Sequence, residues 1–426
     1  MRIAIMGVGS RGDAQPMAVL GAELRRRGHD VTACVTSDLV DFMAGMGLTA
    51  VGAGFSAKEF LGSGEGTRLA AGGDARSFMK LLLDLFAEHA DNLHSAMIKA
   101  AEDADVIVAG LLTLGEAMCL AESRGVPLVA LDLAPTSKNS AFPPILAAQR
   151  KYPGAVNRVM HTRAERARWQ VTSQSINDFR AQLHLPAAAE PVDVRLQRAA
   201  ALRIQAYSRH LVPELDHWGP LRPLVGFLAM SHDQHSLLGE GAVDSDTGKW
   251  LADGEPPAFV GFGSMPVPSP SALLKMIDGF SLAAGMRVLV GAGWSAVHND
   301  VGVDPSRVRI VGGIDHGAVL PRCRIAVHHG GAGTTAAVVR AGLPAVVCSF
   351  SVDQPFWGRR LERLGIGQSM PFTGLSEASL LRAAESMLGE EPRQRAGRVA
   401  ALIREENAVG TAADLIEATA ERQKRQ

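Results

Sequence analysis

The chain has 426 residues, more than a single hydrophobic core usually supports, so two domains are expected. Hydrophobic residues make up 47% and charged residues 20%, which is typical of a well-packed globular protein, and the net charge of -1 gives no reason to expect nucleic acid or an anionic membrane as the main partner. The four cysteines are widely separated and form no Cys-x-x-Cys pair, which predicts buried, reduced thiols in a cytoplasmic protein rather than a disulfide framework.

The first half of the chain alternates short apolar strands with helices. The opening segment, residues 1–6, is too short an apolar run for a signal peptide and predicts a first strand, and without a run of about 18 uncharged apolar residues no stable membrane insertion is expected. Residues 52–73 are rich in Gly and Ser and are expected to form a mobile loop. Strands are predicted at residues 3–6, 31–36, 48–51, 106–109 and 128–131, and helices at residues 15–27, 38–46, 77–102 and 114–123.

The second half repeats this rhythm after an irregular, proline-rich stretch at residues 134–156 and a charged helix at residues 157–183. Strands are predicted at residues 202–207, 224–227, 258–260, 287–290, 308–311, 324–327 and 345–348, helices at residues 271–284, 334–340 and 354–364, and a helical tail at residues 377–426. The expected domains are residues 1–229, a linker at 230–244, residues 245–400, and a C-terminal helix at 401–426 able to pack back on the first domain.

Repeated strand–helix units predict an α/β fold, with two Rossmann-like domains whose parallel sheets face each other across a cleft. Ligands of such sheets bind at the carboxyl ends of the strands. The segment at residues 324–335, RIAVHHGGAGTT, has the order of a buried strand, a glycine-rich turn and a helix. Glycine amides and a helix N-terminus together make an anion site. Asp353 and Gln354 follow the next apolar strand, and we expect the two loops to bind a nucleotide-sugar.

A second glycine-rich turn, GVGSRG at residues 7–12, matches the dinucleotide pattern, and Asp38 lies where a ribose-binding acid would be expected. The match continues into Asp13, whose carboxylate would repel a pyrophosphate bound at this turn. A carboxylate there is better suited to accept a proton from a neutral hydroxyl. An NAD-dependent oxidoreductase therefore stays the alternative to a nucleotide-sugar enzyme.

Four segments together resemble one family: GSRGDAQP at residues 9–16, HHGGAGTT at 328–335, AGLP at 341–344 and DQPFWG at 353–358. They are similar to the family 1 glycosyltransferases of GT-B fold, in particular to sterol 3-beta-glucosyltransferases and to enzymes that glycosylate antibiotic aglycones, such as those of the vancomycin pathway. The resemblance implies an inverting transferase that moves a hexose from a nucleotide diphosphate-sugar to a small apolar acceptor with a hydroxyl group, such as a natural-product aglycone or a sterol-like lipid.

The resemblance also assigns roles to residues. Asp13 matches the general base, and Gly313 replaces a tryptophan that stacks on uracil in plant members, which leaves Trp294 as the candidate for base stacking and UDP or dTDP as open donors. The other donor-binding candidates are Ser10 and Ser264 near the phosphates, Arg11 without a more specific role, Ile314 for the base, His329, Gly331, Gly333 and Thr334 for the diphosphate, and Asp353 and Gln354 for the sugar hydroxyls. The acceptor-side candidates are Pro135, Thr136 and Phe142.

No Asp-x-Asp with the character of a metal ligand occurs near a predicted strand end, so the sequence predicts catalysis without a metal or other cofactor, with amides and side-chain donors stabilising the departing diphosphate. Two simpler interpretations stay open. Asp13 could be no more than a cap for a helix beginning near Pro16, and His328 is expected to be structural. A nucleotide-sugar-binding protein without transferase activity is the third functional candidate. A monomer or a homodimer is expected.

Overall fold

The computed structural model describes residues 1–72, 74–147, 150–240, 243–295 and 301–424. By contacts the chain forms two compact units. The first contains residues 1–57, 81–228 and 407–426, and the second contains residues 58–80 and 229–406. Residues 58–80 thus group with the second unit, although they precede most of the first unit in the chain.

The first unit is built on a six-stranded parallel sheet of order β3-β2-β1-β4-β5-β6. Its strands are β1 (Arg2–Met6), β2 (Asp30–Val35), β3 (Thr49–Gly52), β4 (Val106–Ala109), β5 (Leu128–Asp132) and β6 (Leu202–Gln205). The chain builds outward from β1 to one edge and then from β4 to the other, so the direction of winding changes between β1 and β4. That change leaves a crevice position at the carboxyl ends of these two strands.

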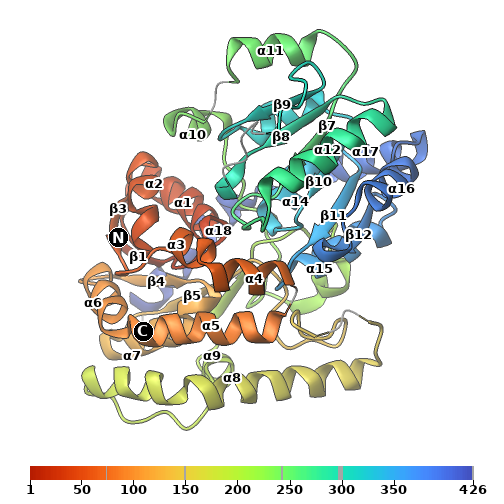
Figure 1. Cartoon of the computed structure of the whole chain (residues 1–426). Helices are drawn as coiled ribbons and strands as arrows, with labels where there is room; N and C mark the ends of the chain where they lie inside the picture. The colour runs from red at the N-terminus through yellow and green to blue at the C-terminus, as the bar shows by residue number, and fades with distance from the viewer. Residues whose placement is uncertain (73, 148–149, 241–242, 296–300, 425–426) are drawn as a thin grey trace. The chain divides into compact units, whose positions relative to one another are not determined.

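Helices cover this sheet (Figure 1). They are α1 (Arg11–Arg26), α2 (Val40–Gly45), α6 (Ala90–Ala100), α7 (Leu114–Arg124), α8 (Gly154–Gln182), α9 (Val192–Arg198) and α18 (Ala408–Lys424), with α5 (Ala75–Glu88) joining the two units in sequence. The C-terminal helix α18 lies against α1. Arg27 Nη1, directly after α1, lies 2.6 Å from Asp414 Oδ1 and 2.8 Å from Glu417 Oε2, so the arginine run at residues 25–27 is partly engaged within this unit.

Three local predictions before residue 230 are wrong. The helix expected at residues 77–102 is two helices, α5 and α6, which are separated at His89, whose ring stacks on Phe55 with centroids 5.4 Å apart. The mobile loop expected at residues 52–73 contains the helices α3 (Ala57–Gly62) and α4 (Gly64–Gly72). Residues 224–227 form no strand, and only Leu224 pairs with β6, through Gln205.

The second unit repeats the same sheet order as β12-β11-β10-β7-β8-β9, again with all strands parallel. Its strands are β7 (Ala258–Gly261), β8 (Val288–Gly291), β9 (Val308–Val311), β10 (Ile325–His328), β11 (Ala345–Ser349) and β12 (Gly367–Pro371). Its main helices are α10 (His232–Leu237), α11 (Ser245–Ala252), α12 (Pro270–Ala284), α13 (His316–Val319), α14 (Ala332–Ala341), α15 (Gln354–Arg363), α16 (Glu377–Met387) and α17 (Glu390–Arg404). Helix α10 lies within the stretch expected to be a plain linker.

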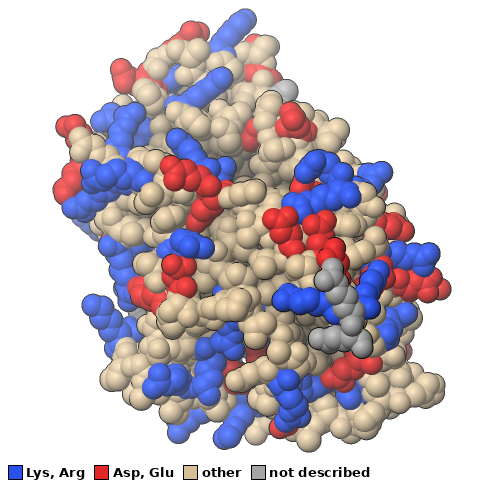
Figure 2. All heavy atoms as spheres, turned by 180° about the vertical axis from the view of Figure 1, so that it is seen from behind, with Lys and Arg blue, Asp and Glu red and all other residues tan. Residues whose placement is uncertain are grey.

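The surface carries no strong overall charge. Figure 2 shows basic and acidic side chains interspersed over the face that it presents, which agrees with the net charge of -1. All four cysteines are free and buried, as predicted. None of the helices in the described ranges is long and apolar enough to cross a membrane.

Candidate functional site

Three strand ends come together in the second unit. Strand β10 pairs with β7 on one side and with β11 on the other, with His328 opposite Gly261 and opposite Val347. Because the strands are parallel, the loops that leave their carboxyl ends lie at one edge of the sheet. These loops carry most of the predicted donor-binding residues, and the winding direction of the sheet changes between β7 and β10. The edge is therefore where a doubly wound sheet binds its ligand.

The imidazole of His329 fills the space between two glycines. A Cβ added to Gly331 would lie 2.4 Å from Nε2, and one added to Gly263 would lie 3.0 Å from Cε1. Both glycines are thus needed for the ring to occupy this position. Burial and the nearby His316 lower the pKa of His329 to about 4, while the Gly261 carbonyl favours the protonated ring. The imidazole is therefore neutral near pH 7.

His328 stabilises the glycine-rich turn after β10 from its buried side. Its ring is fully buried, and Nδ1 accepts a hydrogen bond of 3.1 Å from the Gly330 amide. The neutral ring therefore carries its proton on Nε2, which has no hydrogen-bond partner among the described residues. Burial lowers the pKa of His328 to about 3, so the ring stays neutral. Gly330 has φ +89°, and a Cβ there would lie 2.6 Å from Val347 Cγ1, so the sharp turn also needs glycine.

The loop after β7 meets the loop after β8. Residues 262–265 form a turn closed by the Met265 amide and the Phe262 carbonyl at 3.0 Å, and it presents a half-buried Ser264. The Trp294 amide donates to the Gly263 carbonyl at 3.0 Å, and a Cβ on Gly293 would lie 2.2 Å from that oxygen. The backbone before Trp294 is thus fixed against the Ser264 turn.

The remaining donor candidates lie on the neighbouring connections. Gly333 and Thr334 are in the first turn of α14, whose N-cap is Gly331, and the space around Gly333 is open. Ile314 is half-buried and lies between β9 and α13. In the described part of the chain, no group of three or more His, Cys, Asp or Glu residues could hold a metal ion.

Asp353 and Gln354 stand at the start of α15. Asp353 is its N-cap, and Oδ2 accepts from Trp357 Nε1 at 2.9 Å, so the buried tryptophan orients the carboxylate. Gln354 Oε1 accepts from the Phe350 amide at 2.8 Å, which leaves the side-chain NH2 without a partner in the described ranges. Val352 just before them has φ +58°, a conformation that is strained for a β-branched residue and that is often found at ligand-binding loops.

In the first unit, Asp13 belongs to the turn after β1. It is the N3 residue of α1, and Oδ2 accepts from the Ser10 amide at 2.8 Å and from the Ser10 hydroxyl at 3.0 Å. The helix begins at Arg11, so the alternative in which Asp13 caps a helix beginning near Pro16 is wrong in position, although Asp13 does take part in a capping box. Burial raises the pKa of Asp13, and the hydrogen bonds from Ser10 oppose that rise.

The neighbours of Asp13 fix its position. Gly9 has φ +143°, and a Cβ there would lie 2.5 Å from Asp13 Oδ2, so the turn closes tightly over the carboxylate. Arg11, a donor-binding candidate, is engaged within the unit: Nε donates to Gln15 Oε1 at 3.0 Å and the guanidinium lies over the Phe42 ring. Ser10, through its hydroxyl, accepts from the Gly12 amide at 3.2 Å.

The acceptor-side candidates lie in the loop after β5, two strands from Asp13 in the order β1-β4-β5. Pro135 and Phe142 are buried, and the Thr136 hydroxyl donates to Asp132 Oδ1 at 3.1 Å. Asn139 Oδ1 accepts from the Phe142 amide at 2.7 Å. Residues 136–142 of this loop are therefore held in place by hydrogen bonds.

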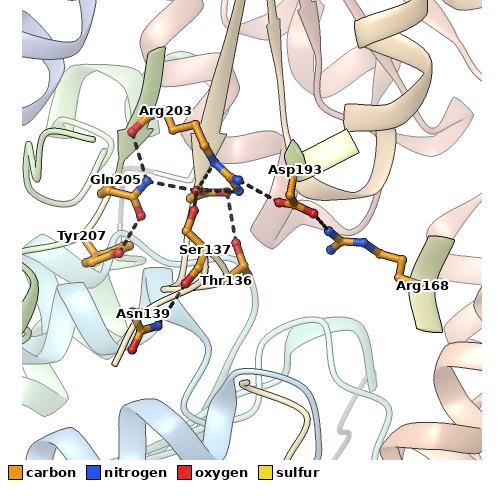
Figure 3. A network of polar contacts seen from close by, with 9 residues as sticks. Thr136, Ser137, Asn139, Arg168, Asp193, Arg203, Gln205 and Tyr207 are labelled. Atoms are coloured by element: carbon orange, nitrogen blue, oxygen red, sulfur yellow. Dashed lines mark hydrogen bonds and ion pairs between the residues drawn. The ribbon is translucent and has the colours of Figure 1, made fainter. Parts of the chain in front are cut away.

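That loop is held by a buried polar network (Figure 3) that the sequence patterns did not predict. Asp132, at the end of β5, accepts from Arg203 Nε and Nη2, both at 3.1 Å, and from Gln205 Nε2 at 3.0 Å. Burial of Arg203 disfavours its charge, but Asp132 and Asp193 outweigh this effect and raise its pKa. The sequence features that could have indicated this network are a carboxylate at the end of one strand and an arginine and a glutamine on the next.

Comparisons with known proteins find relatives along the whole chain. The C-terminal domain family described as erythromycin biosynthesis protein CIII-like matches residues 293–417. A protein of Mycobacterium leprae described as an uncharacterised glycosyltransferase is 33% identical over 431 residues, covering 100% of this chain and 98% of its own. A sterol 3-beta-glucosyltransferase of Arabidopsis thaliana is 28% identical, and the alignment covers 97% of this chain and 64% of the plant protein.

Solved structures show the same fold. The glycotransferase of kitacinnamycin aligns with a TM-score of 0.73 at 19% identity over 98% of both chains. The glycosyltransferase VinC, in complex with dTDP, aligns with a TM-score of 0.67 at 17% identity over 99% of this chain and 100% of its own. The prediction of two doubly wound sheets of the GT-B kind is confirmed.

Proposed function

This chain belongs to the glycosyltransferases of GT-B fold, and from that premise we propose that it moves a hexose from UDP- or dTDP-sugar to a hydroxyl of a small apolar acceptor. The transfer inverts the anomeric centre and uses no metal. The observation that carries the proposal is the position of His329, whose ring lies between Gly263 and Gly331 beside the N-terminus of α14. Side-chain and backbone donors thus converge where a diphosphate would bind.

The second unit, which binds the donor in this proposal, supplies fixed dipoles. The amides that begin α14, with Ser264 and Thr334, replace the water that would otherwise solvate the departing diphosphate. His329 is neutral without ligand because its pKa is about 4, and an adjacent diphosphate favours the protonated ring. Either form of the ring donates to a phosphate oxygen through Nε2, the ring nitrogen that lies beside Gly331, because the neutral tautomer with its proton on Nε2 is also a donor. The NH2 group of Gln354 and the carboxylate of Asp353 are the groups proposed to bind the sugar hydroxyls.

Asp13 is the proposed general base. The acceptor oxygen attacks the anomeric carbon from the face opposite the diphosphate, its proton passes to the Asp13 carboxylate, and the bond to the diphosphate oxygen breaks. Burial raises the pKa of Asp13, which strengthens it as a base, and Ser10 holds Oδ2 in place through two hydrogen bonds. One displacement of this kind inverts the centre and needs no covalent intermediate.

The acceptor is proposed to be an aglycone or a sterol-like lipid. Phe142 and Pro135 are apolar residues of the loop after β5, which hydrogen bonds of Asp132 and Asn139 fix in place. The sterol named for the plant relative and the natural product named for the structural neighbour support this class. The dTDP bound to VinC supports a nucleoside diphosphate donor.

A donor-by-acceptor panel tests the function. UDP- and dTDP-hexoses are each incubated with sterols and aromatic aglycones, and products are identified by mass spectrometry. Wild-type protein should give a product heavier by one hexosyl residue and release free nucleoside diphosphate. Thermal stabilisation by NAD, with none by UDP or dTDP, would favour the oxidoreductase alternative. Stabilisation by UDP or dTDP without product for any acceptor would favour a binding protein.

A further inference from the structure

One segment of the first unit departs from the balanced charge of the chain. Residues 133–177 contain seven basic residues and one acidic residue, whereas the whole chain has a net charge of -1. The basic residues are Lys138, Arg150, Lys151, Arg158, Arg163, Arg166 and Arg168, and the acidic residue is Glu165. This segment contains most of helix α8 and the loop before it.

Glu165 does not offset the positive charge at the surface. Its side chain is half-buried, and Asp193, Lys138 and Arg168 are among the charges that act on it, so it faces the interior of the unit. Burial and the negative charge of Asp193 raise the pKa of Glu165, which further weakens it as a counter-charge. The positive charge of Arg168 is offset by an ion pair with Asp193.

The other basic residues are exposed. Lys138 is exposed, and its charge acts on Glu165. Arg150, Lys151, Arg158, Arg163 and Arg166 are also exposed, and none of these five forms an ion pair with a described residue. Exposed apolar side chains accompany them, with Leu146 46% exposed, Val156 41% and Val159 51%. A soluble surface normally offsets basic residues with acidic ones and keeps aliphatic side chains apart.

The helix sorts these side chains into one stripe. Val156, Val159, Arg163 and Arg166 follow each other at spacings of three, four and three residues, so they lie on one face of α8, which we name the α8 stripe. The stripe is about 15 Å long at 1.5 Å per residue. Leu146, Arg150 and Lys151 precede the start of the helix.

We propose that the α8 stripe and the basic residues before it form a peripheral docking surface for an anionic lipid bilayer. Lys and Arg bind headgroup phosphates, and the valines and Leu146 enter the boundary with the acyl chains. A nucleic acid would use the charges but would gain little from the exposed aliphatic side chains, whereas an anionic bilayer offers both phosphates and an apolar phase. The surface implies binding to the membrane face without insertion, and it depends on no step of the glycosyl transfer.

Vesicle flotation tests the proposal. Wild-type protein should float with vesicles of phosphatidylcholine mixed with phosphatidylglycerol, should not float with phosphatidylcholine alone, and should be released by salt. Arg163→Gln with Arg166→Gln should weaken binding about 25-fold, because each basic residue near an anionic surface contributes about fivefold, the equivalent of about 1 kcal/mol. The matched control is Arg393→Gln with Arg398→Gln, two exposed arginines on α17, which should bind as wild type.

Replacing two valines of the α8 stripe distinguishes a bilayer from a polyanion as the partner. Val156→Ser with Val159→Ser should weaken binding to mixed vesicles but not to single-stranded DNA, a polyanion without an apolar phase. Val171→Ser is the control, because Val171 is 62% exposed on α8 but lies outside the stripe. Equal binding to neutral and anionic vesicles, unchanged binding of the arginine variant, or equal loss in either control would overturn the proposal. DNA binding as tight as vesicle binding, with no effect of the valine change, would assign the surface to a polyanion instead.

Discussion

Replacing Gly331 by alanine tests how the anion site is built. The residue has φ -61° and ψ 146°, a conformation that alanine adopts freely, so the change adds no backbone strain. Its new Cβ would lie 2.4 Å from His329 Nε2, whereas real Cβ contacts are essentially never under 3.0 Å. The imidazole must therefore move by more than half an ångström, away from the turn.

The expected loss follows from that displacement. A hydrogen bond to a charged group contributes about 1.5–3 kcal/mol, so losing the bond from His329 to the diphosphate should weaken UDP or dTDP binding about 10- to 100-fold. Isothermal titration calorimetry measures the affinity, and thermal unfolding measures the accompanying loss of stability, which should be about 1–3 kcal/mol from the crowded ring.

Substitutions at two other glycines separate the displacement of the His329 ring from other effects of an added methyl group. Gly397→Ala, in α17 with open space around the new Cβ, should leave nucleotide affinity unchanged and raise stability by up to about 1 kcal/mol. Gly333→Ala also meets no protein atom, so any loss of affinity there would come from the ligand alone. Wild-type nucleotide affinity in Gly331→Ala would refute the assignment of His329 to the diphosphate.

Three further predictions concern the metal, the buried histidines and the network around Asp132. Turnover should be unaffected by EDTA, and a loss that a divalent cation restores would contradict metal-independent transfer. The pKa of His329 is about 4 in the folded chain and 6.5 in the unfolded chain, so the unfolded chain binds more protons and the free energy of unfolding falls as the pH drops through this window. His329→Gln should reduce the loss of unfolding free energy between pH 6.5 and 5 by about 2 kcal/mol, measured by denaturant titrations. An unchanged pH profile of stability would argue against the lowered pKa of His329. Asp132→Asn should cost about 3–5 kcal/mol in urea unfolding, because Arg203 and its neighbours lose their charged partner, and a loss below about 1 kcal/mol would show the network to be dispensable.

The regular elements could be predicted from the sequence because their periodicity is local. Strands such as β4 and β10 are continuous apolar runs, and each is followed by a glycine turn and a helix. The helices within residues 52–73 could not be predicted, because the glycines there suggest flexibility, whereas the structure uses glycine there for close backbone packing. A Cβ on Gly66, for example, would lie 2.2 Å from the Phe60 carbonyl oxygen, so only glycine permits this close approach between α3 and α4.

The location of the donor candidates at one sheet edge could be predicted for a different reason. His329, Gly331 and Gly333 lie within one short segment, so the strand–turn–helix order alone places them at one sheet edge. The Asp132 network joins residues that are about seventy positions apart, and no local pattern relates Asp132 to Arg203. The contacts of Arg11 with Gln15 and Phe42 could not be predicted from the glycine turn alone.

The central claim is that Asp13 takes the proton from the acceptor while the second unit binds the donor. The most direct measurement compares wild type with Asp13→Asn, in which the amide oxygen can still accept from Ser10, using a donor and an acceptor that give product in the panel. We predict a fall in turnover by about 10²- to 10⁴-fold with nearly unchanged nucleotide affinity. Turnover equal to wild type would remove Asp13 from the mechanism and contradict the claim.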